Sequence, residues 1–483
     1  QQDLLTCLYG VGISHDDRTL AIAEHALVFD DPQLQLVAVS VLSSFDLDAA
    51  NDILTKAMKS NYVIVRLEAA YCLAQRRSAN AYGQLAALLS KVDPELHELF
   101  PRLFAMEASA ESQKMLKSLL YDQNEQVRRE SILAIANFGR DDFIEDIRTL
   151  AKEPSFVQQE PCAFALGVFG DEASRSVLEK LAESSSTSVR LAAWQALHRL
   201  GSETASTHIA TLAASGDCFA IALMGSLGAD DNLLAMLLCH DDINIRTNAA
   251  IALLERRDSR CLQGIADILI DSHRDYTLQP ITSHGASLHC WKVTASSSQL
   301  FAKHPQFFEI SQRAREELLI SALELPEDDF INLAEAIFLS CQHDLVPLTV
   351  KLLENLHSEK AIRLLKSHEQ RPGAPFIRAW CCLGLYRMHQ EGPYAEKVLK
   401  IVEKHEDKEV FKARPILPWR MRQNEDMHYQ LTLEESCALL IESFEALARR
   451  QDIKGIEALL KAIRNGNPHN RYTLAGLLMR ASL

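Results

Sequence analysis

The sequence predicts an all-α fold, a right-handed superhelix of stacked helix pairs, and three observations support this. A short apolar pattern that begins with Val-Arg starts at Val65, Val127 and Val189, in steps of 62 residues. Within each copy apolar residues recur at spacings of three and four, which is typical of one face of a helix. The composition agrees, because 47% hydrophobic residues with only 18 glycines and 7% aromatics favour helices over sheets.

The clearest predicted helix is Ser186–Gly201. Small alanines on its apolar face allow a neighbouring helix to approach closely. Gly201 follows the last apolar residue, where a helix often ends in a left-handed cap. Gly170 and Gly139 precede it at steps of 31 residues. Because one such helix cannot bury its face alone, the fixed period predicts a solenoid.

A second set of helices is predicted between these copies, so that each unit is helix, turn, helix. A fourth good copy begins at Ile245, 56 residues after Val189, so the unit near Cys218–Gly228 is predicted to be short. Asp or Asn in the turns should cap the following helix and pair with the Arg of the pattern. These turn residues are Asn61, Asp122, Asp241 and Asp242.

The pattern resembles the HEAT-repeat family, and its short period and Val-Arg-x-x-Ala-Ala-x-x-Leu core look most like the PBS-lyase HEAT-like subgroup. The resemblance covers roughly Leu20–Ile270. It implies an armadillo-like helical solenoid, but little about function, because such repeats occur in enzymes, scaffolds and nucleic-acid binders.

Three regions are predicted: a HEAT-like array at 1–270, an irregular interruption or junction at 271–310, and degenerate helical repeats at 311–483. Asp271–Lys303 has few helical signals, so we predict either a domain junction or a loop across one face of the solenoid. It should also be the segment most open to protease in the N-terminal part of the chain. Ser287–Thr294 alternates enough to form a short strand pair.

Helices are predicted to resume after this interruption and to break again at Phe411–Gln430. The predicted C-terminal helices are Arg313–Leu325, Asp328–Cys341, Leu345–His357, Ser358–Lys366, Phe376–Leu385, Tyr394–His405, Thr432–Arg449, Asp452–Asn465 and His469–Ser482.

No pattern of residues indicates catalysis. The sequence contains no Gly-rich phosphate loop, no His-Glu-x-x-His and no Gly-x-Ser-x-Gly. Imidazole and thiolate groups in the first interruption suit zinc, but their spacing fits no usual structural zinc pattern. We therefore predict no enzyme activity, no catalytic residue, no cofactor and no metal. The zinc candidates are His273, His284, His289 and Cys290.

Phe411–Arg422 has four basic residues, no acid, and Phe and Trp. Such a segment suits nucleic acid or an acidic peptide, but a structural role is favoured because one loop is a small footprint. Eleven scattered Cys without a Cys-x-x-Cys pair favour reduced, buried thiols. We expect a cytoplasmic location without a membrane span, and a signal peptide is left open because the first residue is Gln1.

The predicted function is a protein–protein interaction scaffold or adaptor that uses the concave face formed by the second helices. The alternatives are a bilin-type lyase or isomerase and a nucleic-acid-binding protein. Residues 1–270 hold 37 acids and 23 bases, which favours a partner with a basic or amphipathic face over nucleic acid. The predicted partner-binding residues are Glu68, Tyr71, Gln75, Glu130, Asn137, Gln195, His198, Asn248 and Glu255.

Overall fold

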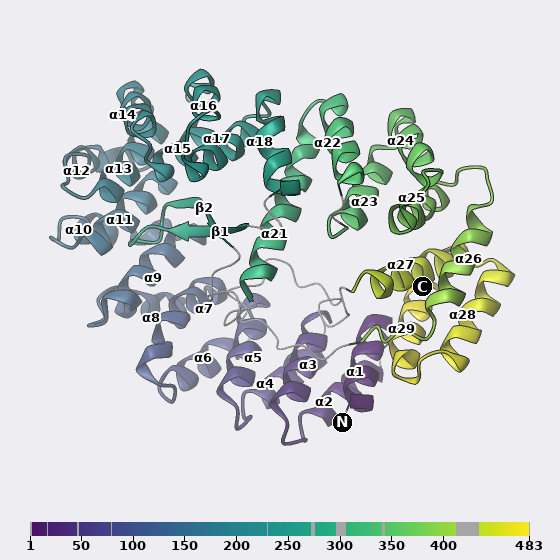
Figure 1. Cartoon of the computed structure of the whole chain (residues 1–483). Coiled ribbons are helices and arrows are strands. Elements are labelled where there is room, and N and C mark those ends of the chain that lie inside the picture. The colour runs from purple at the N-terminus through teal and green to yellow at the C-terminus, as the bar shows by residue number, and fades with distance from the viewer. Residues whose placement is uncertain are drawn as a thin grey trace. The chain divides into compact units, whose positions relative to one another are not determined.

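The computed structural model describes residues 2–16, 18–45, 48–78, 80–228, 230–271, 276–295, 306–340, 343–411 and 434–482. This part consists mainly of α-helices, with short 3-10 turns, a π-helical turn at Asp267–Asp271 and one β-hairpin (Figure 1), so the all-α superhelix prediction is confirmed. The chain divides into two compact units, unit 1 (Gln1–Gln113 and Leu356–Leu483) and unit 2 (Lys114–Asn355). The predicted limits at 270 and 310 mark changes of sequence pattern and stay a prediction.

Unit 1 contains helices from both ends of the chain. Those near the N-terminus are α1 (Gln2–Ser14), α2 (Arg18–Ala26), α3 (Pro32–Ser43), α4 (Asp48–Ala57), α5 (Val63–Gln75), α6 (Ala81–Leu89) and α7 (Phe100–Glu107). Those near the C-terminus are α24 (Glu359–Glu369), α25 (Pro375–Arg387), α26 (Tyr394–His405), α27 (Glu435–Arg450), α28 (Ile453–Asn465) and α29 (Arg471–Ser482).

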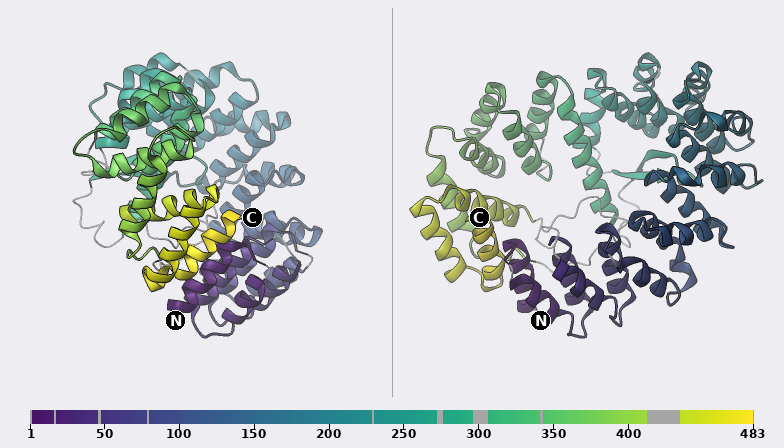
Figure 2. Two further views of the ribbon diagram at one scale, coloured as in Figure 1. Left: turned by 90° about the vertical axis from the view of Figure 1, so that its right-hand side faces the viewer. Right: turned by 180° about the vertical axis from the view of Figure 1, so that it is seen from behind.

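The first and last helices of the chain pack against each other in unit 1, as both views of Figure 2 show. Gly10 of α1 and Gly476 of α29 lie at the crossing, where a Cβ on either residue would overlap the backbone of the other helix. Nearby, the rings of Tyr9 and Phe411 meet edge to face with centroids 5.6 Å apart. The two chain ends therefore share one stack of helices, with α1 lying between α29 and α3.

Unit 2 continues the pattern of helix pairs. Its helices include α9 (Glu125–Asn137), α10 (Ile144–Leu150), α11 (Phe156–Phe169), α12 (Arg175–Leu181), α13 (Thr187–Arg199), α14 (Glu203–Ala214), α15 (Cys218–Leu227), α16 (Asp231–Leu237), α17 (Ile243–Glu255), α18 (Leu262–Ala266), α21 (Gln306–Ser321) and α22 (Glu327–Leu339). Helices α8 (Ala110–Leu120) and α23 (Val346–Leu356) lie at the limits between the units. The second helices of neighbouring pairs, such as α9, α11 and α13, pack on one another.

The repeat signals in the sequence correspond to helix ends. Gly139, Gly170 and Gly201 all have positive φ, at 63°, 63° and 82°, which confirms the left-handed caps. Of the four predicted capping residues, Asp242 caps its helix, α17, by accepting a hydrogen bond from the Asn244 N–H at 2.7 Å. The prediction is wrong for Asn61 and Asp122, because the N-cap residues of α5 and α9 are Tyr62 and Asn124.

The predicted pairing of the repeated arginines with Asp or Asn side chains is wrong. Arg128 Nη1 donates to the backbone carbonyls of Asp122 and Gln123, at 2.7 and 3.0 Å. Arg190 does the same in the next turn of this kind, donating to the carbonyls of Ser184 and Ser185. The guanidinium holds the turn through its main chain, which explains why the side chains in the turn vary among the units.

Trp194 is half-buried, and its ring stacks on His208 of α14 with centroids 4.9 Å apart and planes 10° apart. Full burial of a Trp would make its replacement by Ala cost about 3–5 kcal/mol. Because this ring keeps one exposed side, we expect Trp194→Ala to destabilise the protein by about 1–3 kcal/mol. Urea unfolding followed by circular dichroism measures this. Trp194→Phe keeps an aromatic ring that can stack on His208, so it should lose less stability than Trp194→Ala. Equal stability of all three proteins would contradict the stacked contact.

Between α18 and α21 of unit 2, the chain forms an antiparallel hairpin of β1 (Tyr276–Thr282) and β2 (His289–Ala295). The strand prediction for Ser287–Thr294 located β2 but placed both strands within a segment that holds only one. The hairpin lies against α15 and α17, on the concave side of unit 2's row of helix pairs (Figure 1). For residues 276–295, the described part of the predicted interruption, this arrangement favours a segment that lies across one face of the solenoid.

Other sequence predictions concern smaller features. Cys72, Cys162, Cys381 and Cys437 are buried and form no disulfide, and burial raises the pKa of Cys162. Phe411 is fully buried, whereas the basic residues of Phe411–Arg422 lie outside the described residues. In the part of the chain that the structure covers, no helix is both long and apolar enough to span a membrane.

Candidate interaction face

The second helices of the pairs present one stripe of residues, which we call the inner stripe. It contains the residues two, five, six, nine, twelve and thirteen positions after the N-cap residue of each helix. Such spacings place side chains on one side of an α-helix. The nine predicted partner-binding residues all lie on it, because Glu68, Tyr71 and Gln75 follow the N-cap Tyr62 by six, nine and thirteen positions. The rest follow the N-caps of α9, α13 and α17 in the same way.

The hairpin shows that this stripe binds polypeptide main chain. Asn248 of α17 accepts a hydrogen bond from the Trp291 N–H at 2.8 Å and donates Nδ2 to the Trp291 carbonyl at 2.7 Å. Asn244 accepts from the Val293 N–H at 2.9 Å. Two side chains of a helix thereby replace a neighbouring strand along the outer edge of β2, and Asn248 is almost completely buried there.

The turn of the hairpin encloses the buried carboxylate of Glu160 on α11. This carboxylate accepts hydrogen bonds from Gly285 N–H at 3.0 Å, from Ser287 N–H at 3.2 Å and from Ser287 Oγ at 2.8 Å. The Ser283 hydroxyl also donates to it. Because a buried carboxylate is costly unless its oxygens are hydrogen-bonded, these four donors explain how Glu160 remains inside. A Cβ at position 285 would lie 2.6 Å from the Glu160 carboxyl carbon, so only glycine fits.

Further contacts close the other sides of the hairpin. Arg129 of α9 donates to the His284 carbonyl at 3.3 Å. On the outer edge of β1, the Leu278 N–H donates to Ser311 Oγ of α21 at 3.0 Å, and Pro280 has no N–H to satisfy. A strand edge that is bonded or blocked in this way does not attract a further strand.

The structure separates the nine predicted residues by exposure. Glu68, Gln195 and Asn248 are buried, Tyr71, Glu130 and His198 are half-buried, and Gln75, Asn137 and Glu255 are exposed. Asn248 contacts the hairpin, and Glu130 pairs with Arg129 at 2.8 Å. The glutamates of the stripe therefore do not form a continuous acidic surface, because Glu68 is buried and Glu130 is paired with its neighbour Arg129. A role in partner binding stays a prediction for all nine.

Sequence analysis missed Asn244, Glu160 and Arg129, which hold the hairpin. Position provides the only available signal, since Asn244 lies two residues after its N-cap and Glu160 and Arg129 lie five after theirs. Of the zinc candidates, His273 lies outside the described residues. Among the residues that are described, no three His, Cys, Asp or Glu side chains lie close enough to hold a metal ion.

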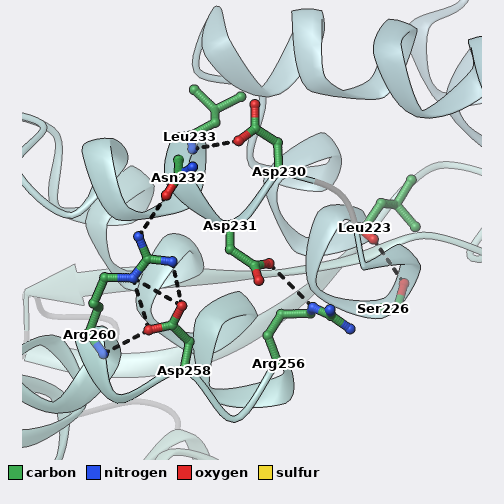
Figure 3. A network of polar contacts seen from close by, with 9 residues as sticks. All are labelled: Leu223, Ser226, Asp230, Asp231, Asn232, Leu233, Arg256, Asp258 and Arg260. Atoms are coloured by element: carbon green, nitrogen blue, oxygen red, sulfur yellow. Dashed lines mark hydrogen bonds and ion pairs between the residues drawn. The ribbon is translucent and has the colours of Figure 1, made fainter.

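A second polar network joins the start of α16 to the end of α17 and does not contact the hairpin turn at Glu160 (Figure 3). Arg256 Nε donates to Asp231 at 3.3 Å, and Arg260 Nη1 donates to Asn232 at 3.0 Å. Arg260 also bonds Asp258 and holds the pKa of that carboxyl below its usual value. These side chains are largely exposed, so the network contributes little stability, and we assign it the role of joining two adjacent helix ends.

Fold and face together define a helical-repeat protein whose second helices contact a polypeptide segment. No family model matches the chain, and no curated protein matches its sequence. Known structures that are similar to this chain include the complex of CpcE and CpcF of phycocyanin lyase from Nostoc sp. PCC7120. That chain has 19% identity and a TM-score of 0.26, over 50% of this chain and 91% of its own.

Two further structures are similar at the same low level. UNC-45 from Drosophila melanogaster has 10% identity and a TM-score of 0.31, over 96% of this chain and 74% of its own. A homology model of the full-length AP-3 complex in an intermediate open conformation has 12% identity and a TM-score of 0.30, over 97% of this chain and 90% of its own. Similarity at these levels carries no argument about what this chain binds.

The hairpin contacts also give a direct test of main-chain binding by Asn248. Asn248→Ala should destabilise the protein by about 2–3 kcal/mol, because both polar groups of the Trp291 peptide lose their partner in a buried position. Chemical denaturation measures the loss. Asn137→Ala, an exposed change on the inner stripe of α9, is the control and should be nearly neutral. Equal effects of the two changes would show that Asn248 does not hold β2.

Proposed function

We propose that this chain is a non-catalytic scaffold or adaptor that binds partner polypeptides on its inner stripe. One observation carries the proposal: the inner stripe of unit 2 already holds a polypeptide segment, the hairpin, mainly through its main chain. A surface that satisfies backbone N–H and C=O groups in one segment has the chemistry to do so in another.

The charge of the chain guides the expected partner. The excess of acids in residues 1–270 still favours a partner with a basic or amphipathic face. Glu68 and Glu130 do not contribute free, exposed carboxylates to that attraction, so it rests on the net charge of residues 1–270. Reversal of Glu68 to Lys would bury a cation and unfold the helix, so it does not test binding.

Site-directed photo-crosslinking in the native cell tests the proposal. A photoreactive residue is placed at Gln75 or at Asn137, both exposed on the inner stripe, and at Lys180, exposed on the first helix α12 as a matched control. We expect one set of proteins to crosslink from the inner stripe and not from Lys180. Crosslinks that come equally from Lys180, or only from it, would contradict the proposal. Absorbance of a bound pigment in the purified protein would favour the lyase alternative instead.

A further inference from the structure

The inner stripe of α13 carries a polar pair without hydrogen-bond partners in the described part of the chain. Gln195 is only 7% exposed, and its Oε1 is buried with no donor near it. His198, three residues later and therefore one turn along the same side, has a buried Nδ1 that is likewise unpaired. Buried polar atoms nearly always have a partner, so two unpaired atoms on the inner stripe indicate that a partner reaches them from outside once the side chains that cover them move aside.

The position of Gln195 matches the main-chain contact already described. Asn248 lies six residues after its N-cap, and Gln195 lies nine after Ser186, so both belong to the inner stripe. Both side chains are amides, which offer one donor and one acceptor to a peptide group. Asn248 uses the two groups on Trp291, whereas the acceptor of Gln195 is unoccupied.

An apolar surface lies beside Gln195 on the neighbouring helix. Helices α11 and α13 cross closely, since a Cβ on Gly167 would lie 2.6 Å from the Ala196 Cβ. Phe164, nine residues after the N-cap Ser155, lies on the inner stripe of α11 one turn before this crossing, and Val168 one turn further is 41% exposed. The Arg199 guanidinium lies over the Phe164 ring, 5.7 Å from its centroid.

We propose that Gln195 binds the main chain of an extended segment of a partner protein, in the way that Asn248 binds Trp291, and that an apolar side chain of this segment packs on Phe164 and Val168. The proposal rests on the scaffold function above and adds the mode of recognition. Arg199 beside the apolar surface disfavours a Lys or Arg at that point of the partner, so basic residues of the segment lie elsewhere along it.

The free protein provides the first test. Gln195→Met keeps the length of the side chain and removes the unpaired amide, so the melting temperature should rise by roughly 1–3 °C. Gln75→Met, the same change at an exposed position of the inner stripe in unit 1, is the control and should leave it unchanged. A fall in melting temperature for Gln195→Met would show that the amide is bonded within the chain, and it would overturn the proposal.

The second test uses linear peptides selected from a phage-displayed random library on the full-length protein. The selected peptides should lose about tenfold or more in affinity on Gln195→Met, and a similar factor when one particular peptide amide is N-methylated. The two losses should not add, because both remove the same contact. Failure to select any peptide, or selected peptides that tolerate both changes, would overturn main-chain recognition at Gln195. If the photo-crosslinking experiment still gives crosslinks from Asn137, the scaffold function is retained even though this mode of recognition is wrong.

Discussion

Replacing Gly476 with Ala is expected to destabilise unit 1 by about 3 kcal/mol or more, as a marked fall in its melting temperature. The new methyl group would overlap the Gly10 carbonyl of α1, and backbone cannot move aside as a flexible side chain does. Gly10→Ala should have the same effect, because its Cβ would overlap the backbone of Tyr472 on α29. The two changes together should cost less than their sum, since the first already separates the helices.

Gly83→Ala is the matched control for this experiment. Gly83 lies inside α6 with nothing within 4 Å of an added Cβ, so the same change should stabilise the helix by up to about 1 kcal/mol. Hydrogen exchange measured by mass spectrometry shows where the loss occurs, and α1 and α29 should exchange fastest in Gly476→Ala. Normal stability of both variants at Gly10 and Gly476 would contradict the packing of the two chain ends.

The second large effect is expected at the turn of the hairpin. Glu160→Gln is nearly isosteric, but it removes the charge and turns an NH₂ group toward hydroxyl and N–H donors. Gln keeps one acceptor oxygen, which can serve the three donors to Oε1, so the Gly285 N–H loses its acceptor and faces the new NH₂ group. With the charge also lost from a buried site, we expect a cost of about 2–4 kcal/mol and release of the hairpin from α11. Limited proteolysis should then cut within 276–295. In the wild-type protein we expect this hairpin to resist protease, because both of its strands are hydrogen-bonded to helices, in contrast to the expectation from the sequence that the segment is open.

An independent change on the other side of this contact sharpens the test. Gly285→Ala places a methyl group against Glu160 and should release the same segment without altering any charge. Glu172→Gln removes an exposed carboxylate that pairs with Arg175 at 2.6 Å, and it should leave the protease pattern unchanged. If Glu160→Gln and Gly285→Ala are both resistant to protease in 276–295, the turn does not depend on this carboxylate.

Local signals explain how much of the fold the sequence predicted. Periodic apolar residues, the glycines at positive φ and the spacing of Val-Arg determine each helix from its neighbours along the chain, so the helix pairs followed from them. The stripe of nine residues followed as well, because it is what remains after the apolar face is assigned to the core. The last three helices, at α27, α28 and α29, begin within three residues of their predicted starts.

The contacts that the sequence did not predict join distant parts of the chain. Glu160 meets Ser283 across 123 residues, and neither residue has a local pattern that indicates the other. Pro280 reads as a break in a strand, yet it fits because its side of β1 needs no donor there. The crossing at Gly10 and Gly476 is likewise invisible in the repeat, since each glycine appears to be an ordinary weak point inside a helix.

The central claim is that side chains of the inner stripe hold polypeptide main chain. Residue-resolved hydrogen exchange of the wild-type protein tests it most directly, at the amides of Trp291 and Val293 on β2. The Trp291 N–H donates to Asn248 and the Val293 N–H donates to Asn244, both on α17. We therefore predict that these two amides exchange as slowly as the amides inside α17 itself. Exchange at the rate of an open strand edge, with α17 still protected, would contradict the claim.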